Sequence, residues 1–126
     1  MNGNKALFDS NVIIYLSKGI IRLEDFTSSY EEFNVSIISY IETLGYDFTN
    51  ETEEALVENF LNTFSILPLT NDVADLVIDY RKRSRIKIPD AIILATASLS
   101  ESILITNNVN DFKGIDSKVT IEEIKP

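Results

Sequence analysis

This 126-residue sequence contains no cysteine and no histidine. The absence of cysteine excludes a disulfide framework and a thiolate zinc site, and the absence of histidine removes imidazole as a metal ligand and as a general base. A nucleophile activated in the Ser-His-Asp or Cys-His manner is therefore excluded. If the chain is an enzyme, its chemistry must depend on carboxylates, hydroxyls, amides, lysines or a hard metal ion.

The sequence also lacks a long apolar run at its start and an excess of basic residues. Residues 1–5 lead into a short apolar stretch that Asp9 interrupts, so we expect neither a signal peptide nor a membrane span, and we predict a cytoplasmic protein. The 20 acidic residues outnumber the 11 basic ones, and the net charge of −9 argues against binding nucleic acid by bulk charge. The length and the 44% hydrophobic content predict a single domain over residues 1–126.

Short apolar segments alternate with amphipathic ones along the chain. The first predicted strand ends near Asp9, and a short helix follows with Ser10 or Asn11 as its cap. Further strands are predicted over 33–38, 65–69 and 103–106, and an edge strand or extended tail over 119–124. A helix followed by a turn is predicted over 24–32, and helices over 36–46, 50–64, 70–85 and 89–97. This alternation predicts an α/β fold of three layers, α/β/α, with a central, mainly parallel, twisted sheet.

Acidic residues occupy the positions where such a sheet places its ligands. Asp9 ends the first strand and Asp111 follows the strand over 103–106, so both belong to the carboxyl edge of the predicted sheet. Glu42 lies in the helix after the second strand, and Asp90 begins the helix after Pro89. Carboxylates gathered in one cleft repel each other unless a cation holds them, and a site with oxygen ligands alone suits Mg²⁺ or Mn²⁺.

Each acid also has a purely structural explanation. Asp9 before Ser10 is a common capping residue, and Asp90 after Pro89 is a common acid of a first helical turn. Asp111 fits an Asx-type loop. Glu42 is less ordinary, because it stands among apolar residues where an unpaired carboxylate costs free energy. No single residue decides between a structural and a functional role.

Four segments, taken together and in order, resemble the motifs of PIN domains. Residues 7–16, LFDSNVIIYL, resemble the opening strand with its terminal Asp and the Ser-Asn pair that follows. Residues 36–45, SIISYIETLG, resemble the second motif with its Glu inside a helix. Residues 88–97, IPDAIILATA, are similar to the Pro-Asp motif before an alanine-spaced helix, and residues 104–112, LITNNVNDF, resemble the closing motif. The resemblance covers most of the chain, from about residue 6 to residue 112.

The resemblance implies a compact α/β/α domain that hydrolyses RNA with Mg²⁺ or Mn²⁺. In a small chain it further implies the VapC-type toxin of a VapBC toxin–antitoxin pair, a VapB-like antitoxin as partner, and a homodimer. Carried over by position, the catalytic and metal-binding acids are Asp9, Glu42, Asp90 and Asp111, and the supporting polar residues are Asn11, Thr106 and Asn107. Many relatives have another acid or a basic residue where this chain has Asn107 and Asn108, so one metal is expected to be held firmly and a second only weakly.

One stretch of the acidic chain is basic. Five of the eleven basic residues precede the Pro-Asp motif, namely Arg81, Lys82, Arg83, Arg85 and Lys87. They are either a solvated helix end, where cations suit the helix dipole, or a rim that grips RNA phosphates beside the acids. Both roles are compatible with each other.

The helices over 50–64 and 70–85 carry much apolar surface. Phe60, Phe64, Leu76 and Tyr80 are either core residues, the preferred interpretation, or part of an exposed face for a homodimer or an antitoxin helix.

Two alternative functions stay open at this stage. One is a catalytically weak PIN-like domain that binds RNA or protein and regulates without turnover. The other, ranked lower, is a phosphoacceptor receiver domain, which needs an Asp at the end of a middle strand where this chain has Ser and Ile.

Overall fold

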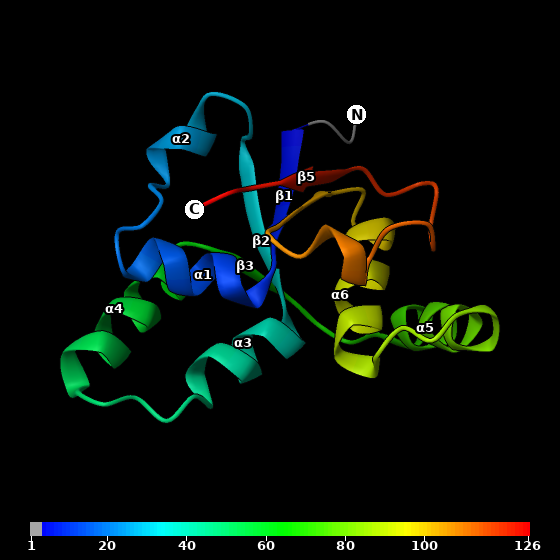
Figure 1. The fold of residues 1–126 in the computed structure, drawn as a ribbon, viewed down its shortest axis with the longest axis horizontal. Helices are drawn as coiled ribbons and strands as arrows, with labels where there is room; N and C mark the ends of the chain where they lie inside the picture. The colour runs from blue at the N-terminus through cyan, green and yellow to red at the C-terminus, as the bar shows by residue number, and fades with distance from the viewer. Residues whose placement is uncertain (1–3) are drawn as a thin grey trace.

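The computed structural model describes residues 4–126, and residues 1–3 of the predicted domain lie outside the described part. The elements are, in chain order, β1 (Lys5–Phe8), α1 (Ser10–Ser17), α2 (Glu24–Thr27), β2 (Glu32–Ser36), α3 (Ile37–Leu44), α4 (Glu51–Asn62), β3 (Ser65–Leu67), α5 (Asn71–Arg83), α6 (Ile88–Leu99), β4 (Ile103–Thr106), the short 3-10 helix η2 (Val109–Asp111) and β5 (Ile121–Glu123). Strands and helices alternate as the sequence pattern predicts (Figure 1).

The strands form one sheet in the order β3-β2-β1-β4-β5. Every neighbouring pair in this sheet is parallel, including the edge strand β5 against β4. The registers place Phe8 opposite Ile105 and Ser36 opposite Leu67, so the carboxyl ends of the central strands meet at the same edge. The prediction of a mainly parallel sheet is confirmed, and the ligand sites of such a sheet belong at this edge.

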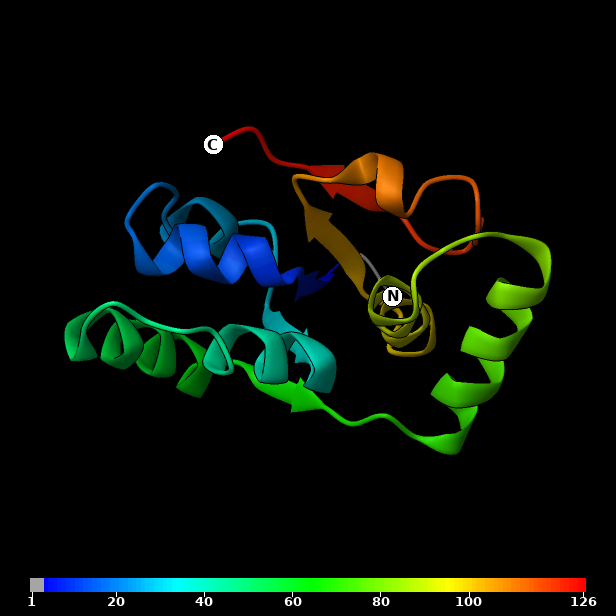
Figure 2. The same ribbon diagram turned by 60° about the horizontal axis from the view of Figure 1, so that its bottom comes forward.

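Alternate residues of the central strands point into two separate apolar layers. Leu7 and Leu104 pack with residues of α5 and α6 on one face of the sheet. Phe8 and Ile105 pack with residues of α1 and α4 on the other face. This alternation follows from the two-residue period of a strand. Helices therefore cover both faces of the sheet, which confirms the three-layer architecture (Figure 2).

Side-chain caps set several helix boundaries. The Asn50 carboxamide accepts a hydrogen bond from the Glu53 amide at 2.8 Å, and the Thr70 hydroxyl accepts one from the Val73 amide at 3.2 Å. Ser36 caps α3 in the same manner, so β2 ends there and Ile38 belongs to the helix. The predicted strand over 33–38 is thus too long by two residues, because the serine cap draws them into α3.

The apolar residues of α4 and α5 mostly serve the core. Tyr80 and Phe64 are buried, while Phe60 and Leu76 are partly buried against the two apolar layers. The preferred interpretation of core packing is therefore confirmed. Within residues 4–126 the structure contains no helix that is long and apolar enough to cross a membrane.

A buried tyrosine ties the segment before β5 to α5. The Tyr80 hydroxyl donates a hydrogen bond to the carboxylate of Asp116, which lies between η2 and β5. Burial acts to raise the pKa of Asp116, but the hydrogen bonds from Tyr80, the Lys118 amide and Ser98 outweigh it and lower the pKa below its ordinary value. The ionised form of Asp116 is thus favoured by folding.

Replacing Tyr80 by Phe should lower the free energy of unfolding by about 1 kcal/mol at neutral pH, because the ring still fills the core while the hydrogen bond is lost. The pKa of Asp116 is lower in the folded than in the unfolded chain, so this stability is present above pH 4 and is lost as the pH falls. Urea unfolding at pH 7 and at pH 3 should therefore show a smaller difference between wild type and variant at pH 3. Tyr46→Phe, an exposed tyrosine, is the matched control and should leave stability unchanged; equal stability of Tyr80→Phe and wild type at pH 7 would contradict the role of the hydrogen bond.

Candidate functional site

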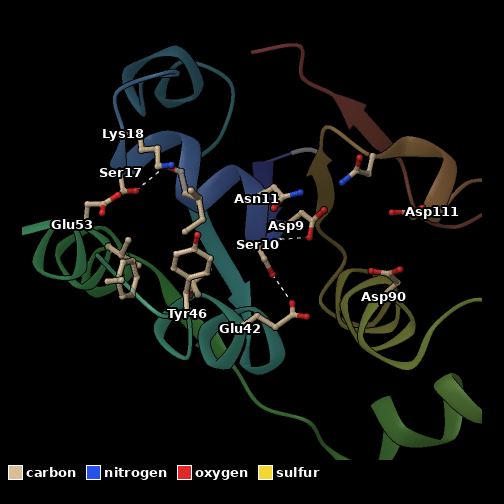
Figure 3. Close-up of a pocket in the computed structure, with 15 residues that line it drawn as sticks. Asp9, Ser10, Asn11, Ser17, Lys18, Glu42, Tyr46, Glu53, Asp90 and Asp111 are labelled. Carbon is tan, nitrogen blue, oxygen red and sulfur yellow. Dashed lines mark hydrogen bonds between the residues drawn. The ribbon is translucent and has the colours of Figure 1, made fainter. Parts of the chain in front are cut away.

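One pocket at the carboxyl edge of the sheet brings the four predicted acids together. It has a volume of about 370 Å³ and is lined by Asp9, Glu42, Asp90 and Asp111. Asp9 follows β1, Glu42 lies on α3, Asp90 is in the first turn of α6 and Asp111 ends η2 after β4. Figure 3 shows Asp9 and Glu42 facing Asp90 and Asp111. We call the part of the pocket that these four acids line the acidic end.

Asp9 is held in a single orientation by two hydrogen bonds. The side chain is only 7% exposed. Its Oδ1 accepts from the Ser10 amide at 2.7 Å, which makes Asp9 the N-cap of α1. This confirms the capping interpretation of Asp9, whereas the prediction of Ser10 or Asn11 as the cap is wrong. Its Oδ2 accepts from the Thr106 hydroxyl at 2.8 Å. The structural and functional explanations of Asp9 are therefore compatible, because one carboxylate caps a helix and also lines the pocket.

The acids influence each other electrostatically. Burial raises the pKa of Asp90 to about 6, with further contributions from Asp111, Asp9 and Glu42, and Lys87 opposes this rise. Burial also raises the pKa of Asp9, where the Thr106 and Ser10 hydrogen bonds act in the opposite direction and Glu42 and Asp111 add to the rise. Such mutual destabilisation of the ionised forms is typical of a site that a cation stabilises.

Glu42 is exposed, and this differs from the sequence expectation of a carboxylate near the buried side of its helix. The Ser10 hydroxyl donates to its Oε1 at 2.7 Å, as the dashed line in Figure 3 marks. Ser10 joins the site through this contact, although the sequence suggested it only as a cap. The one sequence signal for this role of Ser10 was its position directly after an Asp at the end of a strand.

The donor set fits a hard divalent cation in its chemistry, since it consists of carboxylate oxygens beside Ser10 and Asn11 in a shared pocket. As the side chains stand, however, no three acids in residues 4–126 lie close enough together to hold a metal ion. Glu42 is turned toward Ser10, and the three aspartates are separate in Figure 3. Binding a cation would therefore require the freer carboxylates to rotate toward Asp9, which is fixed.

The predicted supporting residues lie at different distances from the acids. Asn11 lines the pocket, and Thr106 supports Asp9 from below its surface. Asn107 instead donates from Nδ2 to the Tyr15 hydroxyl at 3.0 Å. Its neighbour Asn108 lines the pocket, with its amide donating to the Thr106 hydroxyl at 3.0 Å.

The five basic residues after the middle of α5 separate into two groups. Arg81 donates to the Ile86 carbonyl at 2.5 Å, and Arg83 donates to Asp79 at 3.1 Å and to the Ile115 carbonyl at 2.7 Å. Lys82 is exposed on α5. Arg85 and Lys87 line a shallow hollow that also includes Asp90 and Asp111, so these two cations lie beside the acidic end.

The fold and the pocket together define a class of protein. Its members are α/β/α domains with four acids at the carboxyl edge of a parallel sheet. The profile of the PIN domain family matches residues 6–118. The chain belongs to the PIN domain family, as the four sequence motifs implied. No curated protein sequence matches the chain significantly.

Several solved structures share the fold. A chain from a toxin–antitoxin complex of Klebsiella pneumoniae is 34% identical, with a TM-score of 0.74 and coverage of 94% of this chain and 99% of that one. A chain from DNA-bound VapBC of Salmonella typhimurium has a TM-score of 0.82 at 22% identity, covering 95% and 98%. A chain from VapBC2 of Rickettsia felis, bound to a DNA fragment from its promoter, has a TM-score of 0.81 at 18% identity, covering 96% and 99%.

Asp90→Asn should stabilise the metal-free protein at pH 7 by about 1 kcal/mol, a figure reduced from the full pKa shift because Asp90 is partly exposed. A raised pKa means that the folded chain holds the proton more tightly, so the stability tied to neutral Asp90 is present below about pH 4 and is lost as the pH rises through about 6. Addition of Mg²⁺ should raise the melting temperature of wild type and leave Asp90→Asn almost unchanged.

Thermal unfolding in EDTA and in Mg²⁺, at pH 5 and pH 7, measures both effects. Asp75→Asn is the matched control, because Asp75 is an exposed carboxylate of α5 outside the pocket and the charge change is the same. An Mg²⁺-dependent rise that is equal in wild type and Asp90→Asn would remove Asp90 from the metal site.

Proposed function

We propose that this PIN-domain protein is a metal-dependent endoribonuclease and the toxin of a VapBC-type pair. The observation that carries the proposal is the gathering of Asp9, Glu42, Asp90 and Asp111 around one pocket at the carboxyl edge of the sheet. Membership of the PIN domain family supports a nuclease, and a 34% identical chain from a toxin–antitoxin complex supports the toxin role.

The fixed carboxylate of Asp9 is the anchor of the proposed metal site, and Asp90 and Asp111 complete it from the facing side of the pocket. A bound Mg²⁺ or Mn²⁺ supplies a water of lowered pKa and neutralises charge on the phosphate during hydrolysis. With the cation present, the pKa of Asp90 should fall below its metal-free value of about 6. Asp90 is then ionised at neutral pH and able to act as a ligand.

Glu42 has a different role in this proposal. It faces Asp90 across the pocket and is exposed, with its Oε1 held by the Ser10 hydroxyl. The second oxygen is free to accept a hydrogen bond from the attacking water and to orient it. Because histidine is absent, a carboxylate is the natural group for this task.

The net charge of the protein is −9, so RNA must reach the acidic end against electrostatic repulsion. Arg85 and Lys87 offer the local counter-charge, since both line the hollow that contains Asp90 and Asp111. We therefore assign phosphate contact to these two residues and a structural role to Arg81 and Arg83. The hypothesis that five basic residues form a rim for RNA phosphates is therefore restricted to Arg85 and Lys87.

The proposed partners are a VapB-like antitoxin and a second copy of the chain. The similar solved structures from Salmonella typhimurium and Rickettsia felis are complexes named VapBC. This chain also exposes large apolar side chains on the outer helices α5 and α6, with Ile78 52% and Leu99 49% exposed. Such residues suit contact with another protein chain.

A catalytically weak binding domain is the second candidate. The observation that favours it is the separation of the acids, no three of which can hold an ion as they stand in residues 4–126. The two candidates differ in turnover, which a direct assay measures.

Purified protein should cut a mixed pool of cellular RNA into discrete fragments in Mg²⁺ or Mn²⁺ and leave it intact in EDTA. Asp9→Asn and Asp90→Asn should each reduce the cleavage rate by at least about 100-fold, because each removes a charge that holds the cation. Asp75→Asn should cut at the wild-type rate. Absence of cleavage by wild type, with Mg²⁺ still raising its melting temperature, would favour the binding-domain candidate.

The double change Arg85→Gln and Lys87→Gln should weaken RNA binding about 10-fold and reduce the slope of log affinity against log salt by about one to two. Binding is measured by fluorescence anisotropy in the Asp90→Asn background, in which the strand is not cut. The control is Lys5→Gln with Lys82→Gln, which makes the same charge change away from the acidic end. Equal salt slopes in the two double variants would show that Arg85 and Lys87 make no phosphate contact.

A further inference from the structure

The pocket continues beyond the acids into a second part of different chemistry. This part, which we call the aromatic end, is lined by Ile14, Lys18, Tyr46, Phe48, Glu53 and Val57. Figure 3 shows Tyr46 between Glu42 and the side chains of Lys18 and Glu53. None of these residues is needed for holding a cation at the acidic end, so the aromatic end calls for a separate explanation.

Tyr46 presents its ring to solvent. Its side chain is 65% exposed, and among the exposed large apolar residues of 4–126 it is the only aromatic one. Phe48 packs against it at a ring-centroid distance of 5.4 Å and an interplanar angle of 70°, an edge contact. An edge contact steadies one ring while leaving ring-face area available for stacking by a flat ligand.

The turn after α3 places this ring close to the acids. Tyr46 follows Glu42 by four residues and lies just beyond the C-cap of α3 at Gly45. Gly45 makes the turn possible, because a Cβ at this position would lie only 2.7 Å from the Ile41 carbonyl oxygen. The stacking surface and the acidic end therefore belong to one continuous pocket.

The charges at the aromatic end favour a neutral ligand with polar edges. Lys18 takes part in neither of the ion pairs described for residues 4–126, and its ammonium group offers donors. The Thr49 hydroxyl donates to one oxygen of Glu53 at 2.6 Å, and the other oxygen remains an acceptor. One cation and one anion give no net charge, which suits a nucleobase better than a phosphate, since every base carries both donors and acceptors at its edge.

From this placement we propose that the aromatic end is a nucleobase subsite of the RNA site. A base next to the scissile phosphate stacks on Tyr46, and its edge contacts Lys18 and Glu53. This inference rests on the proposed nuclease function and extends it to substrate selection: the enzyme cuts single-stranded RNA, in which a base is free to leave the helical stack. A side chain of a protein partner is the competing occupant.

Binding of synthetic hexameric single-stranded RNA to the Asp90→Asn background tests the subsite. Tyr46→Leu keeps apolar volume but removes the aromatic face, and it should weaken binding about 10-fold, within the range for loss of one base–aromatic stack. Tyr46→Phe keeps the face and should bind within about twofold of the parent. Leu69→Ala, which removes an exposed apolar side chain in the loop between β3 and α5, outside the pocket, should have no effect.

Hexamers with one abasic nucleotide identify the base. One abasic position should lose as much affinity as Tyr46→Leu, and combining the two changes should cause no further loss. If the parent binds RNA and Tyr46→Leu binds it equally well, the subsite is overturned and the aromatic end belongs to a protein partner. If the parent binds no hexamer and wild type cuts no RNA, the proposed function itself has failed, and the two failures are thereby distinguished.

Discussion

The hydrogen bond from Thr106 to Asp9 is the contact on which the site depends. It joins the ends of β1 and β4 at 2.8 Å and leaves the buried carboxylate with one orientation. The parallel register of these strands makes the contact possible, because it pairs Phe8 with Ile105 and so brings the next residues of both strands to the same edge. The Asn108 amide then donates to the same hydroxyl, so the loop toward η2 is positioned by it as well.

The acids around this contact repel each other electrostatically. Asp9 satisfies both oxygens within the protein, whereas Asp90 carries a pKa of about 6 because burial and the neighbouring charges disfavour its ionised form. Glu42 accepts a hydrogen bond from Ser10 and adds to the raised pKa of Asp9 and Asp90. The folding stability that such a site loses through charge repulsion is commonly recovered when a cation or substrate binds. The same pocket provides a nearly neutral end around Tyr46, where no such repulsion exists.

Much of the fold was predictable from short-range patterns. The order of elements followed from alternating strand and helix periods, and the starts of α4 and α5 followed from Asn50 and Thr70, whose caps act within three residues. The main error, the end of β2, arose where a strand runs directly into a helix at Ser36, since apolar residues such as Ile37 suit both. The four acids were recognisable because strand ends and helix starts are local features.

The sequence by itself therefore determined the element order, the chemistry of the donors and the edge of the sheet where they belong, because these depend on neighbours along the chain. Only the tertiary structure decided which basic residues lie beside the acids. Arg83 binds the carbonyl of Ile115, 32 residues away, whereas Arg85 lies beside the acids. It also decided that Tyr46, which follows α3, shares a pocket with Lys18 at the end of α1. A long or exposed side chain contacts segments that packing brings near it. No local sequence pattern encodes which segments those are.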